Sequence, residues 1–294
     1  MTQVGALELG GTRAVVCVGA GPGRHGPVVE IATTTPDQTL DAVCDAFEQF
    51  RRDGLGFGRI GVASFGPVGV DLARSDFGRI GPTPKPGWEG ADVAGRLADR
   101  LGVEVVLDTD VNGAAIGEGR WGAAAGLGSH AYITVGTGVG VGLVVDGRPV
   151  HGHSHPEGGH LRIRRATGDA YAGRCPWHGD CLEGLICGPA VEERLGFRAE
   201  RAGEDDPIWA LVGDYLGEAC AMLALTAAPE RVVIGGGVGR RPEVLIHARR
   251  ALGRALAGYV AALPDPAGDD YLVAPGLEGR SGLFGAMALA DQAQ

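Results

Sequence analysis

Two glycine-closed hairpins, one at the start of each half of the chain, constrain the fold most strongly. In the first half the apolar, β-branched runs VGALEL and RAVVCVGA are joined by Gly10, Gly11 and Thr12, which predicts an antiparallel hairpin. The second half begins with the longer hairpin AYITVGTGVGVGLVVDGRPV. Strand-like and helix-like runs alternate after each hairpin, a pattern typical of α/β folds. The sequence therefore predicts two similar α/β lobes with a boundary near residue 115.

Hydrophobic periodicity and capping signals predict the remaining elements. In the first half they are strands in VVEIATTT, RIGVASF and VEVVLD, a helix from an N-cap at Asp37 to about Arg52, a helix over 89–101, and a helix that begins at Asp110. In the second half they are strands in RVVIGG and YLVAP, helices around 189–195, 208–227 and 242–263, and a closing helix from Ser281. This order supports the same α/β architecture in both halves.

Charge and composition exclude several classes of protein. The formal net charge is −10 and no run is rich in Lys or Arg, which disfavours nucleic-acid binding. No basic leader or cleavage site precedes the first hairpin, and no apolar run approaches membrane-spanning length. Without secretion signals, the six cysteines are expected to be free thiols or metal ligands. We expect a cytoplasmic protein that contacts neither membranes nor nucleic acid, although ATP remains a suitable ligand because backbone N–H groups can hold small phosphates.

Three glycine clusters are candidate phosphate-binding segments. They are ELGGTR, TVGTGVGVG and VIGGGVG, and the third ends a strand before a helix, where a nucleotide could lie over the backbone. A single cluster of this kind is more often only a turn, and neither a Walker A sequence nor a GxGxxG motif opening a helix is present. Three clusters, with one opening each half, favour phosphate binding. The candidate residues are Gly10, Gly11, Thr12, Arg13, Gly136, Thr137, Gly138, Gly235, Gly236 and Gly237.

The segment DTDVNGAAIGE holds the best candidate for a reactive group. Asp108 ends a predicted strand, and Asp110 stands where the next helix begins. Asp110 could serve only as the N-cap, since Asp is favoured there, but a helix dipole also keeps such a carboxylate ionised. An ionised carboxylate at this junction can accept a proton from an attacking hydroxyl, as phosphoryl transfer requires. Asp110 is therefore the predicted general base.

A metal site is indicated by RCPWHGDCLE, which spaces Cys175, His178 and Cys181 at three-residue intervals. Two thiolates and an imidazole favour zinc over hard cations such as magnesium. The alternative is a chance grouping in which His178 is a surface residue. Upstream, HGHSHPEGGH offers a fourth ligand from among His151, His153, His155 and His160. We choose His160, although the spacing does not separate it from its neighbours.

Two carboxylates flank the proposed metal site. Glu157 precedes His160 by three residues, and Glu183 follows Cys181 by two. A closed zinc site that ties these two loops together would also fix the carboxylates, which are good partners for the hydroxyls of a sugar. The metal is therefore expected to be structural and to hold the wall of a substrate site.

Taken together, these residues resemble the ROK family of sugar kinases and repressors across essentially the whole chain. ELGGTR is similar to the family's phosphate motif and TDVNGAAIGE to its catalytic segment. The E-x-G-H of Glu157–His160 is similar to its sugar motif, and the C-x-E of Cys181–Glu183 to the end of its zinc motif. The resemblance implies that Asp110 is the base, that both glutamates contact sugar, and that His160 contacts sugar while also binding zinc.

The same resemblance implies the two-lobed actin-like ATPase (ribonuclease H-like) fold, with a nucleotide cleft between the lobes. The N-terminal lobe would be residues 1–115, completed by the closing helix over 281–294, and would carry the phosphate hairpin and the catalytic aspartate. Residues 116–280 would form the C-terminal lobe, with the zinc loop and the glycine motif on the adenosine side. Homodimers are usual in the family, so a homodimer is expected.

Within the family, GPTPKPGW, HPEGGH and CPWHGDCLEG look most like the bacterial, zinc-containing fructokinase branch. The usual zinc pattern CxCGxxGCxE is CxxHxxCLE here, so His178 replaces one cysteine, a departure that this branch shares. Thr109 replaces the usual asparagine before the catalytic aspartate, which removes one expected sugar contact and fits a sugar other than glucose. Thr109 is kept in the substrate-binding set. Glu8 stands where many members have Asp, and Arg13 where fructokinases often have Lys, which alters the phosphate contacts. Lys85 in TPKPGW, the only lysine of the chain, is a candidate substrate or phosphate contact.

The leading prediction is a fructokinase that uses Mg-ATP to form fructose 6-phosphate and contains structural zinc. The alternatives within the family are a glucokinase, a mannokinase or a broad hexokinase. A repressor would need a DNA-binding segment ahead of the hairpin that begins by residue 4. A non-catalytic sugar-sensing protein would be expected to lose Asp110 or the glycine hairpins, and a zinc-binding interaction protein would explain only residues 151–183.

Overall fold

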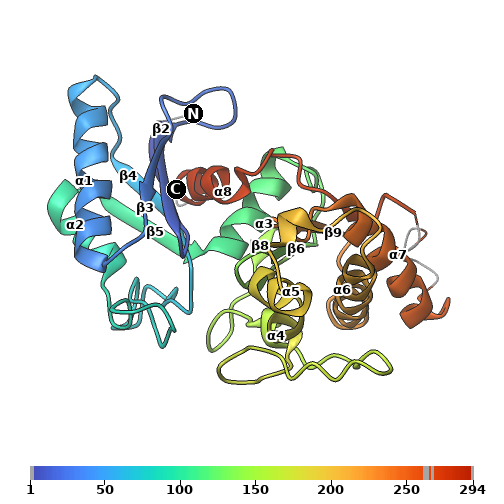
Figure 1. The fold of residues 1–294 in the computed structure, drawn as a ribbon. Coiled ribbons are helices and arrows are strands. Elements are labelled where there is room, and N and C mark those ends of the chain that lie inside the picture. The colour runs from blue at the N-terminus through green and yellow to red at the C-terminus, as the bar shows by residue number, and fades with distance from the viewer. Residues whose placement is uncertain (1–2, 261–264, 266–267, 293–294) are drawn as a thin grey trace. The chain divides into compact units, whose positions relative to one another are not determined.

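The computed structural model describes residues 3–260, 265 and 268–292, which group into two compact units (Figure 1). Unit 1 consists of Met1–Gly122, His151–His155 and Arg280–Gln294, and unit 2 of Ala123–Val150 and Pro156–Gly279. Each unit is built around one five-stranded sheet.

The sheet of unit 1 has the strand order β3-β2-β1-β4-β5. Its strands are β1 (Val4–Leu9), β2 (Arg13–Gly19), β3 (Val29–Ala32), β4 (Arg59–Ser64) and β5 (Glu104–Thr109). β1 and β2 form the predicted antiparallel hairpin, with Leu9 opposite Ala14, and β3 continues the meander. β1, β4 and β5 run parallel, so the carboxyl ends of these three strands lie at one edge of the sheet.

The sheet of unit 2 repeats this arrangement with the order β10-β9-β6-β7-β8. Its strands are β6 (His130–Val135), β7 (Val139–Val145), β8 (Arg148–Pro149), β9 (Arg231–Gly235) and β10 (Leu272–Val273). β6, β7 and β8 form an antiparallel meander, whereas β6, β9 and β10 run parallel. The prediction of two similar α/β lobes is thereby confirmed.

The helices of unit 1 are α1 (Pro36–Arg52), α2 (Val93–Leu101), α3 (Asp110–Trp121) and α8 (Ser281–Gln292). Glycines bring α3 and α8 into direct contact, since a Cβ on Gly285 would lie 1.7 Å from the carbonyl oxygen of Gly113. A Cβ on Gly61 of β4 would likewise lie 1.8 Å from Ala286 O, so α8 also packs directly on the sheet. The closing helix therefore completes unit 1.

Two helices of unit 1 begin elsewhere than predicted, because the capping side chain is a different one. α1 is capped by Thr35, whose side chain accepts a hydrogen bond from a first-turn N–H at 3.4 Å, so Asp37 is not the N-cap and lies in the first turn. α2 begins at Val93 and not near residue 89, because Asp92 accepts a hydrogen bond from a first-turn N–H at 2.8 Å.

The helices of unit 2 are α4 (Leu182–Ile186), α5 (Gly188–Leu195), α6 (Pro207–Thr226) and α7 (Pro242–Leu256), with 3₁₀ turns η1 (Gly158–His160) and η2 (Ala199–Arg201). α6 corrects the expectation that no apolar run reaches membrane-spanning length, because its 20 residues are long and apolar enough to do so. However, 67% of the most apolar 18-residue stretch of the helix is buried. A Cβ on Gly217 would lie 2.5 Å from Ala248 O, so α6 packs closely on α7. α6 is thus a core helix of unit 2.

The end of α7 also differs from the prediction. The helix was expected to run to about Leu263, which lies outside the described residues. α7 ends at Leu256, since Ala257 and Gly258 both adopt left-handed backbone conformations, with φ of +48° and +75°. Two successive residues with positive φ cannot continue a right-handed helix.

Candidate active site and metal centre

The first glycine turn joins β1 to β2 in unit 1. Gly10 N donates to Arg13 O at 2.9 Å, and Thr33 Oγ1 donates to Gly10 O at 2.8 Å, so the turn is fixed from both sides. A Cβ at Gly11 would meet no atom within 4 Å, which leaves the backbone there accessible to a ligand. The guanidinium of Arg13 pairs with Glu30 of β3 at 3.2 Å, and both side chains are more than half exposed. Arg13 therefore forms a surface ion pair beside the turn.

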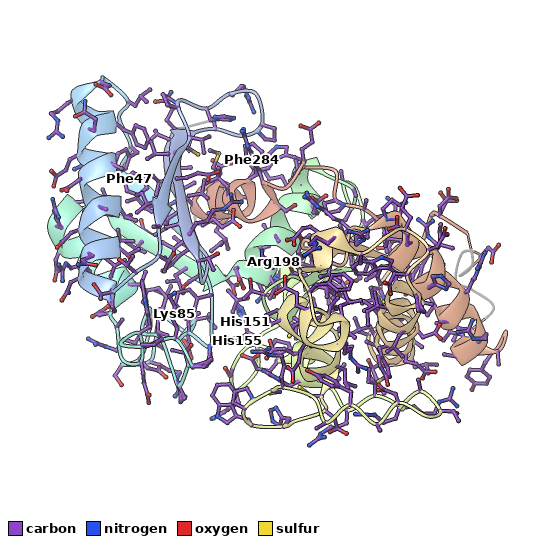
Figure 2. All side chains as sticks on the ribbon, in the orientation of Figure 1. Phe47, Lys85, His151, His155, Arg198 and Phe284 are labelled. Carbon is purple, nitrogen blue, oxygen red and sulfur yellow. The ribbon has the colours of Figure 1, made fainter. Side chains whose placement is uncertain are left out.

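Lys85 reaches the same turn from the loop that follows β4 (Figure 2). Its Nζ donates to the carbonyl oxygen of Gly11 and lies 3.5 Å from Thr33 O. The loop is anchored by Trp88, which is fully buried and donates from Nε1 to Thr34 O at 2.8 Å. The only lysine of the chain thus places a positive charge at the first glycine turn.

Glu8, near the end of β1, connects this turn to α8. Burial raises the pKa of its carboxyl group, while the charge of Arg13 and a hydrogen bond from Leu283 N oppose that rise. A Cβ on Gly282 would lie 2.6 Å from Glu8 Cδ, so the carboxyl group packs against the first turn of α8. The sequence marks Glu8 only as an unusual residue in the phosphate motif, and this contact with α8 carries no local signal.

The junction of β5 and α3 presents Asp110. Thr109 is the N-cap of α3, because its Oγ1 accepts a hydrogen bond from Asn112 N at 3.1 Å. The interpretation of Asp110 as the N-cap is therefore wrong. Asp110 is the first helical residue, and its Oδ1 accepts a hydrogen bond from Val111 N at 2.9 Å. The helix dipole favours the ionised form of a carboxylate at this position.

Asp108, the residue before the cap, is the centre of a buried cluster. Its side chain is 2% exposed, and its Oδ1 accepts hydrogen bonds from Thr109 N at 2.7 Å and Asn112 Nδ2 at 2.8 Å. Its Oδ2 lies 2.9 Å from His151 Nε2. The sequence marks His151 only as a candidate metal ligand, because a contact between a strand end and a distant loop leaves no local pattern. His151 belongs instead to the cluster around Asp108.

The second glycine turn, in unit 2, joins β6 to β7 and is held by Glu183 of α4. Glu183 Oε2 accepts a hydrogen bond from Val139 N at 3.0 Å and would lie 2.8 Å from a Cβ at Gly138. A Cβ at Gly136 would meet no atom within 4 Å, as at Gly11 of the first turn. Each hairpin therefore has one glycine whose backbone is accessible to a ligand.

The third glycine cluster follows β9. A Cβ on Gly235 would lie 2.0 Å from Tyr132 Oη, and Gly236 has φ of +82° with Val135 O 2.3 Å from its Cβ position. Packing and backbone conformation thus explain these two glycines. Gly237 has no atom within 4 Å of its Cβ position, so its backbone is the accessible part of this cluster.

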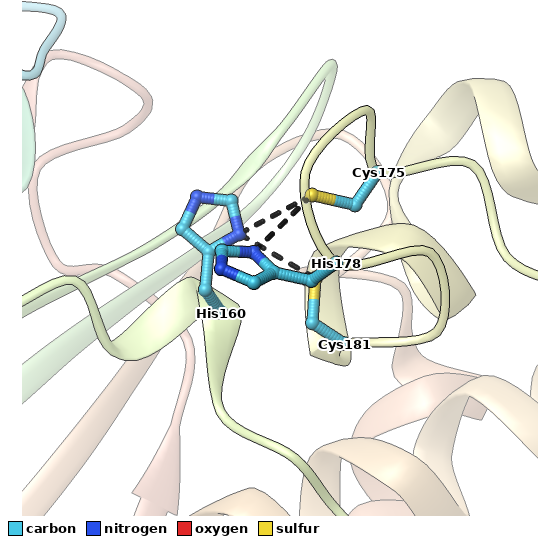
Figure 3. A group of neighbouring side chains, drawn as sticks. All are labelled: His160, Cys175, His178 and Cys181. Carbon is cyan, nitrogen blue, oxygen red and sulfur yellow. Dashed lines mark hydrogen bonds between the residues drawn. The ribbon is translucent and has the colours of Figure 1, made fainter.

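Four side chains of unit 2 converge on one point, as Figure 3 shows. They are those of His160, Cys175, His178 and Cys181, and their ligand atoms all lie within 4.8 Å of one another. Cys175 Sγ lies 3.6 Å from His160 Nδ1 and 3.5 Å from His178 Nδ1. Cys181 Sγ lies 3.4 Å from His160 Nδ1. The fold therefore brings His160 to the loop that carries the other three residues.

These distances fit a tetrahedral zinc ion. With Zn–S and Zn–N bonds of about 2.3 and 2.0 Å, a sulfur and a nitrogen ligand lie about 3.5 Å apart. Burial, reinforced by the neighbouring Cys175, raises the pKa of the Cys181 thiol to about 11, and a divalent cation would hold it as the thiolate. Cys181 Sγ also accepts a hydrogen bond from Gly184 N at 3.5 Å, which ties this residue to the first turn of α4.

Glu157 immediately precedes η1, which ends at His160 and packs directly on β7. A Cβ on Gly159 would lie 1.8 Å from Val139 O. Val139 is also the residue whose N–H binds Glu183. The start of β7 therefore positions both the carboxylate of Glu183 and the segment that carries Glu157 and a metal-site histidine.

The profile of the ROK family matches residues 4–293 of the chain. A fructokinase from Pediococcus pentosaceus is 39% identical over 99% of this chain and 98% of its own length. A fructokinase from Zymomonas mobilis is 36% identical over 99% of this chain and 97% of its own. A solved structure of a ROK family glucokinase from Streptomyces griseus, in complex with glucose and AMPPNP, is 25% identical in sequence. The match covers 99% of this chain and 100% of the glucokinase chain, with a TM-score of 0.78. The similarity to sugar kinases thus extends over the whole chain.

Proposed function

The chain belongs to the ROK family, and from that membership we propose that it is an ATP-dependent fructokinase that forms fructose 6-phosphate. The observation that carries the proposal is end-to-end similarity to two fructokinases at 39% and 36% identity. The aspartate at the β5–α3 junction supports it, because a kinase needs a carboxylate that can take the proton of the attacking hydroxyl. Glucokinase, mannokinase or broad hexokinase activity is the alternative, favoured by the likeness to the Streptomyces griseus glucokinase.

Asp110 is the proposed general base. The 6-hydroxyl oxygen of fructose attacks the γ-phosphorus of ATP, and the bond from that phosphorus to the β–γ bridging oxygen breaks, releasing ADP. The hydroxyl proton passes to the Asp110 carboxylate. The position of Asp110 in the first turn of α3 supports this role, since the helix dipole keeps a carboxylate ionised there.

The nucleotide is assigned to the three glycine segments. The magnesium supplied with ATP would neutralise part of its phosphate charge. Backbone N–H groups of Gly10–Thr12 and Gly136–Gly138 would bind phosphate oxygens, and Gly235–Gly237 would lie on the adenosine side. Lys85 would add a positive charge at the first turn, with Arg13 beside it. The accessible backbone at one glycine of each segment supports this assignment.

Sugar binding is assigned to Glu157, Glu183 and His160 of unit 2 and to the hydroxyl of Thr109 in unit 1. Carboxylates accept hydrogen bonds from sugar hydroxyls, and a neutral imidazole can donate or accept one. Zinc at the Cys/His cluster would fix His160 and therefore η1, a structural role supported by the three sulfur–nitrogen distances of 3.4, 3.5 and 3.6 Å within the cluster. We further propose a cytoplasmic homodimer whose ligands are ATP and a small sugar.

A coupled ATP-consumption assay with fructose, glucose and mannose, each supplied separately with magnesium, tests this function. We expect fructose turnover well above glucose turnover. In Asp110→Asn, kcat should fall by about 10²–10⁴-fold because the base is lost, with the KM for ATP near the wild-type value. The matched control is Asp205→Asn, at an exposed aspartate of unit 2, which should keep wild-type rates.

Two other outcomes would change the assignment. Glucose turnover equal to or above fructose turnover would make the protein a broad hexokinase or glucokinase. No turnover of any of the three sugars, by folded protein that contains zinc, would overturn the kinase assignment and favour a non-catalytic sugar-sensing role.

A further inference from the structure

A five-residue segment, His151–His155, lies between β8 and η1 in the chain but packs as part of unit 1. Figure 2 labels the histidines at its two ends. His155 is 7% exposed and accepts a hydrogen bond from Val68 N at 3.3 Å through Nε2. His151 Nε2 lies 2.9 Å from Asp108 Oδ2. The segment is therefore held at both ends, and one end meets the strand that leads to Asp110.

We propose that His151 is a positioning residue for the proposed base Asp110, acting by neutralising the buried carboxylate of Asp108. The inference rests on the proposed function, since it assigns the role of His151 within the same phosphoryl transfer. His151 itself is not assigned a contact with the substrate or with the transferred phosphate.

Asp108 needs a cation because of its surroundings. A carboxylate that is 2% exposed requires both hydrogen bonds and an opposite charge. Thr109 N and Asn112 Nδ2 supply the hydrogen bonds, and His151 can supply the charge. Asn112 Nδ2 also lies 3.4 Å from His151 Nε2, and the buried Asn112 Oδ1 has no hydrogen-bond partner within the described part of the chain. Asp108 and His151 therefore hold the Asn112 side chain in place together. A change at Asp108 is therefore transmitted to the first turn of α3.

The charge of Asp108 also matters for the chemistry. Only Thr109 separates Asp108 from Asp110 in the sequence. An unbalanced negative charge at Asp108 would raise the pKa of Asp110, because a like charge disfavours the ionised form. It would also disfavour the approach of anionic phosphates. Pairing with a protonated His151 removes both effects.

The pH dependence of the pair has a definite sign. The hydrogen bond to Asp108 raises the pKa of His151; partial burial opposes this rise, and the charges of Asp108 and Asp71 add to it. A raised pKa means that the stabilisation from the pair is complete below the unfolded value of about 6.5 and is lost as the pH rises through the folded pKa. At acidic pH, where Asp110 is closest to becoming protonated and losing its charge, His151 is therefore itself protonated.

The test first removes the positive charge of His151 and then also removes the negative charge of Asp108. His151→Gln keeps a hydrogen-bond donor for Asp108 but removes the positive charge. We expect kcat/KM for fructose to fall about tenfold and the acidic limb of its pH profile to move up by about one pH unit. Adding Asp108→Asn to His151→Gln removes the negative charge as well and should return the limb towards its wild-type position. The control His153→Gln, at an exposed histidine of the same segment, should change neither quantity.

A purely structural role would lower activity without moving the limb. An acidic limb that stays in place in His151→Gln, or that the double variant does not restore, would overturn the inference. NMR titration of the His151 imidazole supplies a reading that needs no turnover: we expect a pKa above 6.5 that falls in Asp108→Asn, and a value at or below 6.5 would also overturn it. If the wild-type protein lacks sugar kinase activity while the titration is as expected, the proposed function fails and the ion pair is supported.

Discussion

Lys85 can be tested more cleanly than most phosphate-contact candidates, because it is the only lysine of the chain. Its Nζ donates to Gly11 O and lies 3.5 Å from Thr33 O, so its charge is fixed at an accessible glycine turn. Trp88 anchors the loop that carries it through a hydrogen bond to Thr34 O. The side chain is therefore positioned before any ligand arrives.

We expect Lys85→Met to lower kcat/KM for ATP by about 10–100-fold, since a positive charge beside the phosphates is removed. Lys85→Arg should retain only part of the activity. The positive charge is kept, but a planar guanidinium does not reproduce the contacts of the compact lysine ammonium group. The measurement is steady-state kinetics with ATP varied at saturating fructose, and the exposed Arg148→Met is the control. Wild-type kinetics in Lys85→Met would contradict the phosphate contact.

At the scale of single residues, the sequence reveals chemistry that is concentrated in one short segment. Cys175, His178 and Cys181 could be grouped because a metal loop repeats ligands at short intervals. His160 could be chosen but not distinguished by spacing, because its approach to that loop depends on how η1 packs on β7. The contact of His151 with the buried Asp108 could not be predicted, because the two residues are far apart in the sequence and no repeating pattern links them.

At the scale of elements, the strands were predictable and the helix ends were less so. Runs of β-branched residues closed by glycines leave few alternatives to a hairpin. Thr35 and Thr109 cap α1 and α3, although each is followed within two residues by an aspartate, which is an equally good cap by residue type. Both threonines have extended backbones, with ψ of 155° and 156°. The N-cap is the residue at which the backbone changes from extended to helical, and residue type alone does not determine which residue that is.

The packing of η1 on β7 makes a prediction at the same scale. In Gly159→Ala the new methyl group would fall 1.8 Å from Val139 O, so η1 must move away from β7. Because Glu157 immediately precedes this turn and His160 is its last residue, we expect the zinc content per chain and kcat/KM for fructose to fall together, the latter by roughly tenfold or more. The measurements are metal analysis of the purified protein and steady-state kinetics.

Gly152→Ala is the matched control for this variant, since a Cβ at Gly152 would meet no atom within 4 Å. Full zinc content together with wild-type kinetics in Gly159→Ala would show that η1 does not set the sugar-binding segment.

At the scale of the whole molecule, the metal cluster should contribute to the stability of unit 2. It joins His160, at the end of η1, to the loop over Cys175–Cys181 and so constrains two separate stretches of the chain. We expect a chelator to lower the thermal midpoint by several degrees and to reduce fructose turnover, with both restored by zinc but not by excess magnesium. Thermal melts and assays after removal of the chelator measure this, and fully active protein that contains no zinc would contradict it.

The position of α8 has a consequence for how the chain matures on the ribosome. α8 packs against β1, β4 and α3, yet it is translated after every residue of unit 2. The strands that start unit 1 therefore leave the exit tunnel early, and the face around Gly61 stays uncovered while both stretches of unit 2, residues 123–150 and 156–279, are made. The half that begins synthesis first is completed last, so the face that α8 will cover is the part of unit 1 that stays exposed longest on the nascent chain.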